Sequence, residues 1–267
     1  MDTSKTPIVL TAFGTTTRAM DTYNYMDKII RERFSNHKIE WAYSSRMVRD
    51  FSKKREKIYL KSPQQVLSDL VAEGYPWAVV QSIHLVCGNE FDRLVEEIQH
   101  VPIRTSVGLP LLHSPKDYDR VAAGIVDLLP ELKEECVIIV GHGTDHPMWA
   151  AYIAFEHKLQ VRYGPDIHVG MIENEDSCER IVQAVRESGK RKALLIPFML
   201  VAGVHFKEDL VGNGEDSWKN RIEREGIEVR AIDKGLGFHR PIVEIFMDHI
   251  KDALDAIPNT ASSSFAS

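Results

Sequence analysis

The sequence predicts an α/β protein with two similar Rossmann-like domains, each built on a parallel sheet and related by internal duplication. Three observations predict this fold. Short β-rich apolar runs alternate with longer segments of helical period, several motifs recur in the same order in both halves, and 267 residues suffice for one large or two small domains. Because parallel strands are joined by helices, the strand-to-helix loops lie at one edge of each sheet. We therefore expect functional residues at these edges.

The predicted elements follow this alternation along the chain. Strands are expected near residues 8–13, 39–44, 77–85, 103–109, 137–140, 168–172, 193–200 and 229–232. Helices are expected near residues 18–35, 46–57, 64–74, 89–100, 116–129, 147–163, 175–188, 215–225 and 239–256. Residues 258–267, rich in serine and alanine, are expected to form a loose tail.

The internal repeat rests on three matched segments. Residues 12–15 match 141–144, residues 85–91 match 200–206, and residues 107–110 match 234–237. The order and similar spacing of these matches indicate duplicated domains over residues 1–130 and 131–257. The alternative is that βαβ units resemble one another through composition alone.

Composition excludes several classes of protein. The formal net charge of −6 leaves no general basic field for nucleic acid, so no nucleic-acid partner is expected. The longest apolar run, residues 193–204, falls short of the ~20 residues needed to span a bilayer and contains a proline and a glycine. Three cysteines with no CxxC pair favour a reducing compartment. With no apolar signal region at the start, we expect a cytoplasmic protein, or a periplasmic one if a signal peptide has been removed.

The second half places three potential metal ligands directly after successive predicted strands: His142, Glu173 and His205. Two imidazoles and one carboxylate at one sheet edge suit a divalent transition metal. Each residue also has a simpler interpretation. A histidine after a strand is more often a hydrogen-bonded loop residue than a ligand, and most glutamates are solvated.

The corresponding positions of the first half hold Phe13, Ser45 and Glu90. The first repeat thus lacks both histidines but keeps one carboxylate, which would face the metal site across a cleft. Flanking glycines at 141 and 143 permit a tight turn around His142. The competing interpretation, a dinucleotide-binding loop, fails because the third glycine of that fingerprint is absent. His84 lies near the end of a predicted strand and is either a core histidine or a cleft residue.

Five motifs occur in a fixed order along the chain: residues 12–15, residues 82–84 with Gly88 and Glu90, residues 141–143, residues 200–203 with His205, and residues 216–218. In this combination the chain resembles the sirohydrochlorin cobaltochelatases of anaerobic cobalamin biosynthesis, class II chelatases that need no ATP. The resemblance runs from residue 8 to about 255. It implies two similar α/β domains with a cleft between them and a tetrapyrrole substrate.

The resemblance also implies roles for individual residues. His142 matches the histidine that binds cobalt and accepts protons, and Glu173 and His205 match the other metal ligands. Glu90 matches a cleft glutamate associated with activity. His84 aligns with a histidine that ligates haem at a subunit interface in some periplasmic members. We also expect a homo-oligomer.

The chemistry of metal insertion fits these residue types. Neutral imidazole ligates Co²⁺ and accepts a proton near neutral pH, and a His/carboxylate set releases the ion more readily than four thiolates would. The substrate carries many carboxylates, so local cations must offset the net charge. The candidates for this role are Arg46, Lys53, Lys54 and Lys207.

Three alternatives remain beside Co²⁺ insertion into sirohydrochlorin. The first is Fe²⁺ insertion for sirohaem or haem, because histidine and glutamate bind iron too. The second is a non-catalytic metal or tetrapyrrole carrier, which would need no second acid/base residue such as Glu90. The third is an unrelated duplicated α/β protein.

Overall fold

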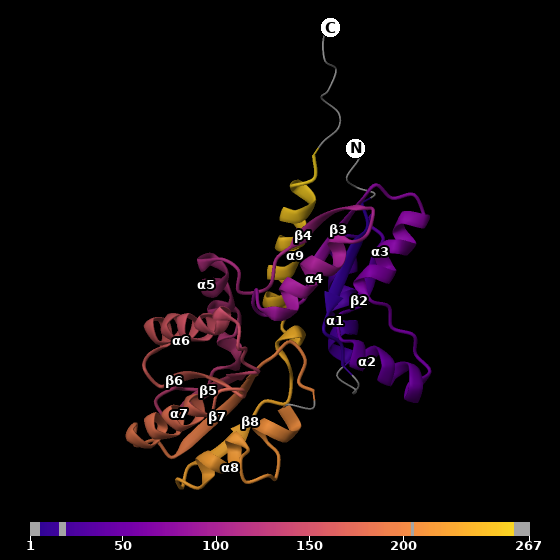
Figure 1. Ribbon diagram of the computed structural model, residues 1–267. Helices are drawn as coiled ribbons and strands as arrows, with labels where there is room; N and C mark the ends of the chain where they lie inside the picture. Colours follow the sequence, from indigo (N-terminus) through magenta and orange to yellow (C-terminus); the bar gives the residue numbers. More distant parts are fainter. Residues whose placement is uncertain (1–5, 16–19, 204–205, 259–267) are drawn as a thin grey trace. The chain divides into compact units, whose positions relative to one another are not determined.

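Two four-stranded parallel sheets form the framework of the protein. Figure 1 shows the computed structural model, which describes residues 6–15, 20–203 and 206–258. The first sheet has the order β2-β1-β3-β4 and the second the order β6-β5-β7-β8, so both follow one topology. The strands are β1 (Ile8–Ala12), β2 (Ile39–Tyr43), β3 (Trp77–Ser82), β4 (Arg104–Gly108), β5 (Glu135–Gly141), β6 (Ile167–Met171), β7 (Lys192–Phe198) and β8 (Glu228–Ala231). This confirms the predicted fold class.

Helices follow the strands in the predicted order. They are α1 (Met20–Arg33), α2 (Arg46–Phe51), α3 (Pro63–Ala72), α4 (Asn89–Gln99), α5 (Pro115–Gly124), α6 (Ala150–Tyr163), α7 (Glu175–Glu187), α8 (Trp218–Glu223) and α9 (Arg240–Asp255). The short turns are η2 (Ser52–Glu56), η3 (Val126–Leu128), η4 (Pro147–Trp149), η5 (Phe206–Leu210) and η6 (Leu236–Phe238). Serine capping boxes at Ser62 and Ser114, each followed by proline, fix where α3 and α5 begin. No helix within the described ranges has the length and apolarity needed to cross a membrane.

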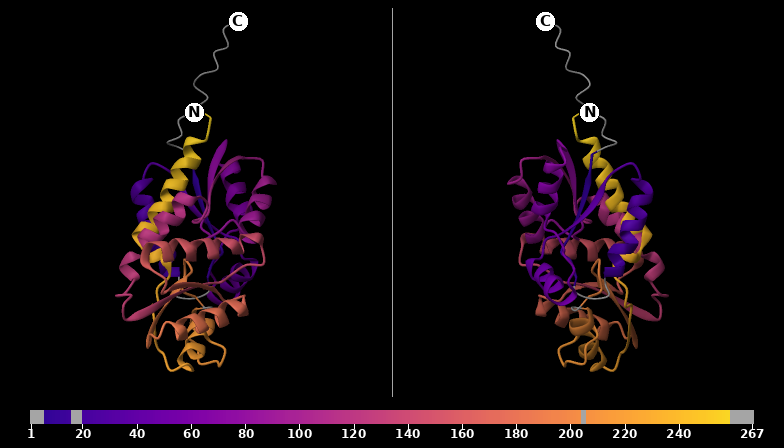
Figure 2. Two further views of the ribbon diagram at one scale, coloured as in Figure 1. Left: turned by 90° about the vertical axis from the view of Figure 1, so that its left-hand side faces the viewer. Right: turned by 90° about the vertical axis from the view of Figure 1, so that its right-hand side faces the viewer.

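The central strands are buried because helices cover both faces of each sheet (Figure 2). Every residue of β1 is buried, as are the last six residues of β5. In the first sheet, α3 and α4 pack on one apolar face, through Leu67 and Leu94 among others. In the second sheet, α7 and α8 cover one face, and α6 covers the other by stacking Phe155 on Phe198 at 4.8 Å. The core is therefore apolar on both faces of each sheet, as parallel sheets require.

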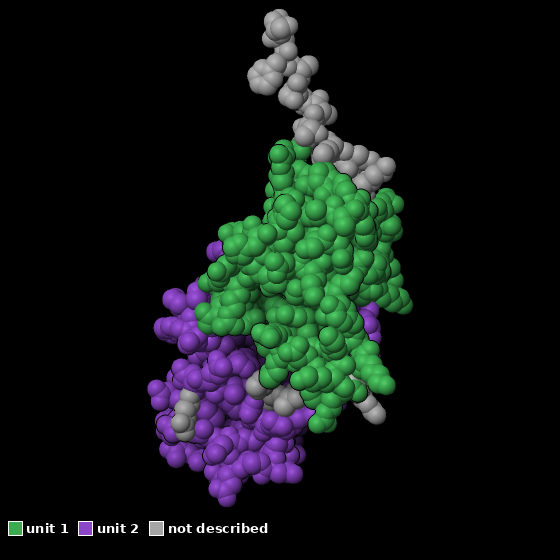
Figure 3. Space-filling view, turned by 45° about the vertical axis from the view of Figure 1, so that its right-hand side comes forward, with its two compact units in different colours: residues 1–16, 26–111, 243–267 green, residues 17–25, 112–242 purple. Residues whose placement is uncertain are grey.

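The chain forms two compact units that are each discontinuous in sequence. Unit 1 contains residues 1–16, 26–111 and 243–267, and unit 2 contains residues 17–25 and 112–242 (Figure 3). Helix α5 therefore lies in unit 2, where Tyr163 donates a hydrogen bond to the Ala122 carbonyl (2.8 Å). Most of α9 lies in unit 1, where Ser106 donates to the Ala253 carbonyl (2.6 Å). The predicted repeat boundary near residue 130 stays a prediction. Helix α5 precedes this boundary in sequence but packs in unit 2, and α9 follows it but packs mostly in unit 1.

Backbone hydrogen bonds refine the repeat alignment. The amide of Leu111 donates to the His84 carbonyl (3.0 Å), and that of Leu236 donates to the Met199 carbonyl (2.8 Å). Leu111 is thus the counterpart of Leu236, so the expected match of 107–110 with 234–237 is shifted by two residues. The shared Gly-Leu letters misled the sequence match because they do not occupy equivalent places in the hydrogen-bond pattern. Helices α5 and α9 are counterparts as well, since α5 begins four residues after Leu111 and α9 begins four residues after Leu236.

A buried ion cluster joins three elements of unit 2. Glu156 of α6 is buried and accepts two hydrogen bonds from Arg180 of α7 (3.1 and 3.0 Å). His168 of β6, also buried, places Nδ1 at 3.6 Å from Glu156 Oε1. Burial raises the pKa of Glu156, but the nearby His168 and the hydrogen bonds from Arg180 outweigh it and lower the pKa below its ordinary value. The cluster therefore stabilises unit 2 while the carboxylate is ionised.

Replacing Arg180 by methionine should lower the free energy of unfolding by about 2 kcal/mol at neutral pH, because it leaves a buried carboxylate without its main partner. This figure is below the value for a fully buried pair, since the Arg180 side chain is 46% exposed. The loss should shrink as the pH falls below the ordinary glutamate pKa, where Glu156 no longer needs a cation. Urea unfolding at several pH values measures it. Arg186→Met, which removes a more exposed ion pair on the same helix, is the matched control, and an equal loss in both variants would contradict the assignment.

Candidate functional site

A tight turn presents His142 at the carboxyl end of β5, the central strand of the second sheet. A Cβ at Gly141 would lie 2.4 Å from the Tyr152 ring, and Gly143 has φ +94°, so both positions favour glycine. The amide of Gly143 donates to the Tyr152 hydroxyl (3.4 Å), and burial raises the pKa of this phenol to about 12. The neutral Tyr152 therefore stabilises the turn through this hydrogen bond. The His142 side chain remains 43% exposed.

Glu173 lies beside His142 because the parallel hydrogen-bond pattern continues beyond the strand ends. The amide of Ile172 donates to the Gly141 carbonyl (2.9 Å), and the amide of Glu173 donates to the His142 carbonyl (3.0 Å). The side chains approach as well, with His142 Nδ1 at 3.5 Å from Glu173 Oε1. Two ligands of a tetrahedral ion, each about 2.1 Å from it, lie about 3.4 Å apart. The pair therefore has the donor separation that one bound divalent metal needs.

The third predicted ligand, His205, lies outside the described residues, between β7 and η5. Within the described ranges, no group of three or more His, Cys, Asp or Glu side chains is arranged to hold a metal. The structure thus brings together two members of the predicted triad.

The first repeat has the same backbone arrangement with different side chains. The amide of Ser45 donates to the Phe13 carbonyl (3.1 Å), as that of Glu173 does to His142. Gly14 has φ +100°, close to the value at Gly143. Phe13 and Ser45 are therefore the counterparts of His142 and Glu173, as the sequence predicts. The first sheet has a 42% exposed phenylalanine where the second has an imidazole.

Glu90, near the start of α4, is held by two neighbours in unit 1. Its Oε1 accepts a hydrogen bond from Arg93 (2.8 Å) and its Oε2 accepts one from Ser44 (3.3 Å). The side chain is 32% exposed, so solvent and a ligand can reach it. Ser44 follows β2, on the far side of β1 from β3, and the contact thus spans the end of the central strand. Glu90 is oriented at the carboxyl edge of the first sheet.

His84 follows β3 and is turned into the protein. Its Nδ1 lies 2.8 Å from Ser82 Oγ, and its Nε2 is buried with no hydrogen-bond partner in the described part of the chain. Burial lowers the pKa of His84 to about 4, so the imidazole is neutral at physiological pH. Of the two interpretations from sequence, this geometry favours a core histidine.

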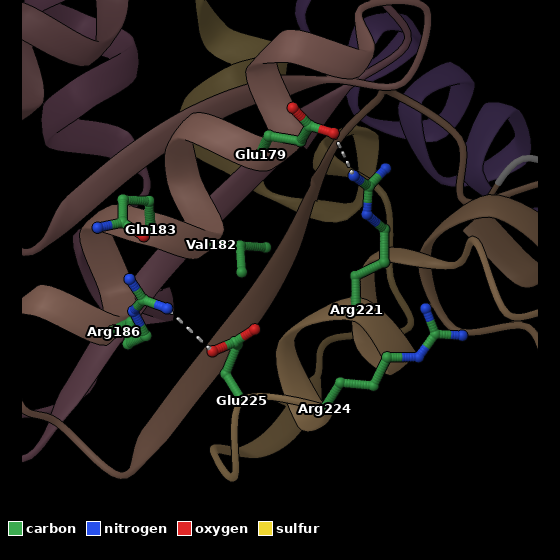
Figure 4. A pocket seen from close by; sticks show the side chains of 7 residues that line it. All are labelled: Glu179, Val182, Gln183, Arg186, Arg221, Arg224 and Glu225. Carbon is green, nitrogen blue, oxygen red and sulfur yellow. Dashed lines mark ion pairs between the residues drawn. The ribbon is translucent and has the colours of Figure 1, made fainter.

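A pocket of about 250 Å³ lies elsewhere in unit 2, between α7 and α8 (Figure 4). Three arginines contribute to its lining, and each has a carboxylate oxygen within 4 Å: Arg186 with Glu225, Arg221 with Glu179, and Arg224 with Glu215. Its lining contains none of the predicted site residues. These internal pairs leave the pocket with little unpaired charge.

Two residues of the site escaped sequence reasoning. Arg93 could have been found, because it lies three positions after Glu90 on a predicted helix, a spacing typical of ion pairs. Ser44 could not, since its approach to Glu90 depends on the strand order.

Comparison with known proteins supports the resemblance in sequence. Residues 6–255 match the cobalt chelatase (CbiK) family. The sirohydrochlorin cobaltochelatase of Salmonella typhimurium is 33% identical over 218 residues, which cover 80% of this chain and 82% of that protein. The sirohydrochlorin cobaltochelatase CbiKC of Nitratidesulfovibrio vulgaris is 30% identical over 265 residues, which cover 95% of this chain and 92% of that protein.

A solved structure supports the fold. Bacillus subtilis SirB, determined with Fe³⁺, superposes with a TM-score of 0.62 at 14% identity, over 94% of this chain and 96% of SirB. At this identity the likeness concerns the fold alone. Because the sequence match spans nearly the whole described chain, and two relatives are at least 30% identical over most of their length, the protein belongs to the cobalt chelatase (CbiK) family.

Proposed function

We propose that the protein inserts Co²⁺ into sirohydrochlorin during cobalamin biosynthesis. The observation that carries this proposal is the pairing of His142 with Glu173 at 3.5 Å on a sheet edge, in a chain of the cobalt chelatase family. The ion is a substrate, held by His142, Glu173 and His205 before transfer. Free cysteines at 87, 136 and 178 fit a reducing compartment, and we propose a cytoplasmic location.

The chemistry needs ligands that exchange and a base. Insertion removes two protons from pyrrole nitrogens and places one Co²⁺ on the macrocycle, with no change of oxidation state. His142 would hold the ion through its imidazole and then accept a proton as the metal leaves it. Glu90 serves as the second acid/base residue, with Ser44 and Arg93 fixing its carboxylate. The insertion rate should fall at low pH, because a protonated imidazole neither ligates nor accepts a proton.

A haem ligand at His84 does not fit this structure. An axial ligand must present an exposed nitrogen to the iron, whereas Nε2 of His84 is buried and Nδ1 is occupied by Ser82. We therefore assign His84 no role in the reaction. That the protein forms a homo-oligomer stays a prediction.

The direct test is anaerobic incubation of the purified protein with sirohydrochlorin and either Co²⁺ or Fe²⁺, following the change in absorbance. Faster insertion of Co²⁺ than of Fe²⁺ supports the proposal. Faster insertion of Fe²⁺ would favour sirohaem synthesis, and tight binding without acceleration would favour a carrier.

His142→Ala should weaken Co²⁺ binding by more than about 100-fold, because it removes a direct ligand. Calorimetric titration with Co²⁺ measures the affinity, and circular dichroism confirms that the variant folds. His157→Ala, which changes an exposed histidine on α6, should leave the affinity unchanged. Equal Co²⁺ binding by both variants would refute the assignment of His142.

Glu90→Gln should leave Co²⁺ binding intact and slow insertion by ~10²–10⁴-fold, because an amide cannot accept a proton. Single-turnover insertion measures the rate. Glu96→Gln, on the exposed side of the same helix, should retain the parent rate. If Glu90→Gln stays within about twofold of the parent, Glu90 has a structural role only.

His84 should make the protein less stable in mild acid. Its pKa of about 4 in the folded state lies below the ordinary histidine value, so its contribution is present above pH ~6.5 and is lost as the pH falls toward 4. The loss should reach about 3 kcal/mol. His84→Asn should flatten this part of the stability curve, whereas His100→Asn, at an exposed site, should not. Parallel curves for the parent protein and His84→Asn would show that the histidine is not buried in solution.

A further inference from the structure

Residues 46–61, here called the basic arm, concentrate positive charge in an acidic protein. The arm comprises α2, η2 and the segment that follows, and it contains seven Lys or Arg residues against two acidic ones, in a chain of net charge −6. Figure 1 shows α2 at one end of the first sheet. Such a local excess of one sign attracts groups of opposite charge.

The arm is an addition that the second repeat lacks. Residues 44–76 connect β2 to β3, whereas the shorter segment 172–191 connects β6 to β7. Four residues separate the end of α3 from β3, and four separate the end of α7 from β7, so these two helices are counterparts. The extra residues precede α3 and correspond to the basic arm. Because the duplicated scaffold folds without them in the second repeat, their presence in the first needs another explanation.

Both ends of the arm are fixed at the carboxyl edge of the first sheet. Ser45 caps α2, and the amide of Tyr43 donates to the Lys61 carbonyl (2.9 Å) where the arm returns. Val48 lies against Gly14, since a Cβ there would be 3.0 Å from Val48 Cγ1. The residue before the cap, Ser44, donates to Glu90. Both ends of the basic arm thus lie next to the segment that contains Phe13 and next to Glu90, the proposed acid/base residue.

Four exposed cations of the arm have no carboxylate within 4 Å among the side chains that the structure describes. These are Lys53, Lys54, Arg55 and Lys57. Arg49 differs, because its guanidinium donates to the carbonyls of Tyr43 and Ser44 (2.7 Å for Ser44) and is structural. Arg46 lies 3.7 Å from Asp50. The three arginines of the pocket between α7 and α8, by contrast, each have a carboxylate partner, and Figure 4 shows the pairs of Arg186 and Arg221.

The arm also exposes apolar surface between its charges. The Arg55 guanidinium lies 5.5 Å from the Phe51 ring centre, and Lys53 Nζ lies 5.9 Å from that of Tyr59. The residues Met47 and Ile58 are 75% and 52% exposed. Cations set on apolar and aromatic groups complement a flat apolar ligand that carries carboxylates at its rim.

We propose that the basic arm binds the carboxylate side chains of the tetrapyrrole substrate, with Lys53, Lys54 and Arg55 as its principal contacts. This inference rests on the proposed function. The arm would then supply the positive charge that the substrate needs in an acidic protein, at the sheet edge where Glu90 lies. The π turn of η2, a feature common at functional sites, presents these three consecutive residues to solvent.

The test is a triple substitution, Lys53→Gln with Lys54→Gln and Arg55→Gln. Its matched control is Lys28→Gln with Lys116→Gln and Lys133→Gln, which removes the same charge from exposed sites elsewhere. Each exposed ion pair contributes a factor of roughly two to five, so the loss of three should raise the KM for sirohydrochlorin by about tenfold to a hundredfold. Its kcat and Co²⁺ affinity should stay within about twofold of the parent. High salt should narrow the difference in KM between the parent and the arm variant, because salt screens the attraction that the three cations exert in the parent.

Binding of metal-free sirohydrochlorin, followed by its fluorescence, separates this inference from the proposed function. If the parent binds the tetrapyrrole but does not insert Co²⁺, the proposed function fails. Weaker tetrapyrrole binding by the arm variant, but not by the control variant, would still support the role of the arm in binding. Equal KM and equal tetrapyrrole affinity in both triple variants would overturn the inference. So would unchanged tetrapyrrole affinity together with loss of binding to phosphatidylserine vesicles, which would assign the arm to a membrane surface.

Discussion

The backbone hydrogen bonds that continue past the ends of the parallel strands determine where the reactive side chains lie. In the second sheet, the bond from the Glu173 amide to the His142 carbonyl brings an imidazole and a carboxylate within 3.5 Å. The bond from Ser45 to Phe13 does the same in the first sheet, with different side chains. Since this register is a property of the scaffold, side chains can change in one repeat without moving the backbone that presents them.

The two repeats have used this freedom differently. The second edge has His142 and Glu173, which suit a metal ion, and a neutral Tyr152 beneath the turn. The first edge has Phe13 and Glu90 beside the root of the basic arm, which suit an apolar ligand with acidic groups. A chelatase must bind an ion and a macrocycle, two ligands of unlike chemistry. Under the proposals above, each repeat would supply the edge that binds one of them.

The packing of helices α5 and α9 differs between the two repeats. Helices α5 and α9 hold equivalent positions in the repeats, yet α5 packs in unit 2 and α9 mostly in unit 1. Each helix is bonded to the unit that it joins, through the carbonyls of Ala122 and Ala253. Neither unit is therefore made from one continuous stretch of chain, and each depends on residues from the other half of the sequence.

Strands, helices and the repeated topology could be predicted from sequence, because each depends on local patterns of apolar and polar residues. The counterparts of His142 and Glu173 in the first repeat were also predictable, since duplication preserves the order of motifs. Tertiary structure alone decided the exchange of α5 and α9, the Ser44–Glu90 contact and the burial of His84 Nε2. It also separated Arg49, which bonds to the carbonyls at the end of β2, from the arm cations that have no carboxylate partner among the described side chains. These features depend on which segments meet in space, and residue types along the chain do not contain that information.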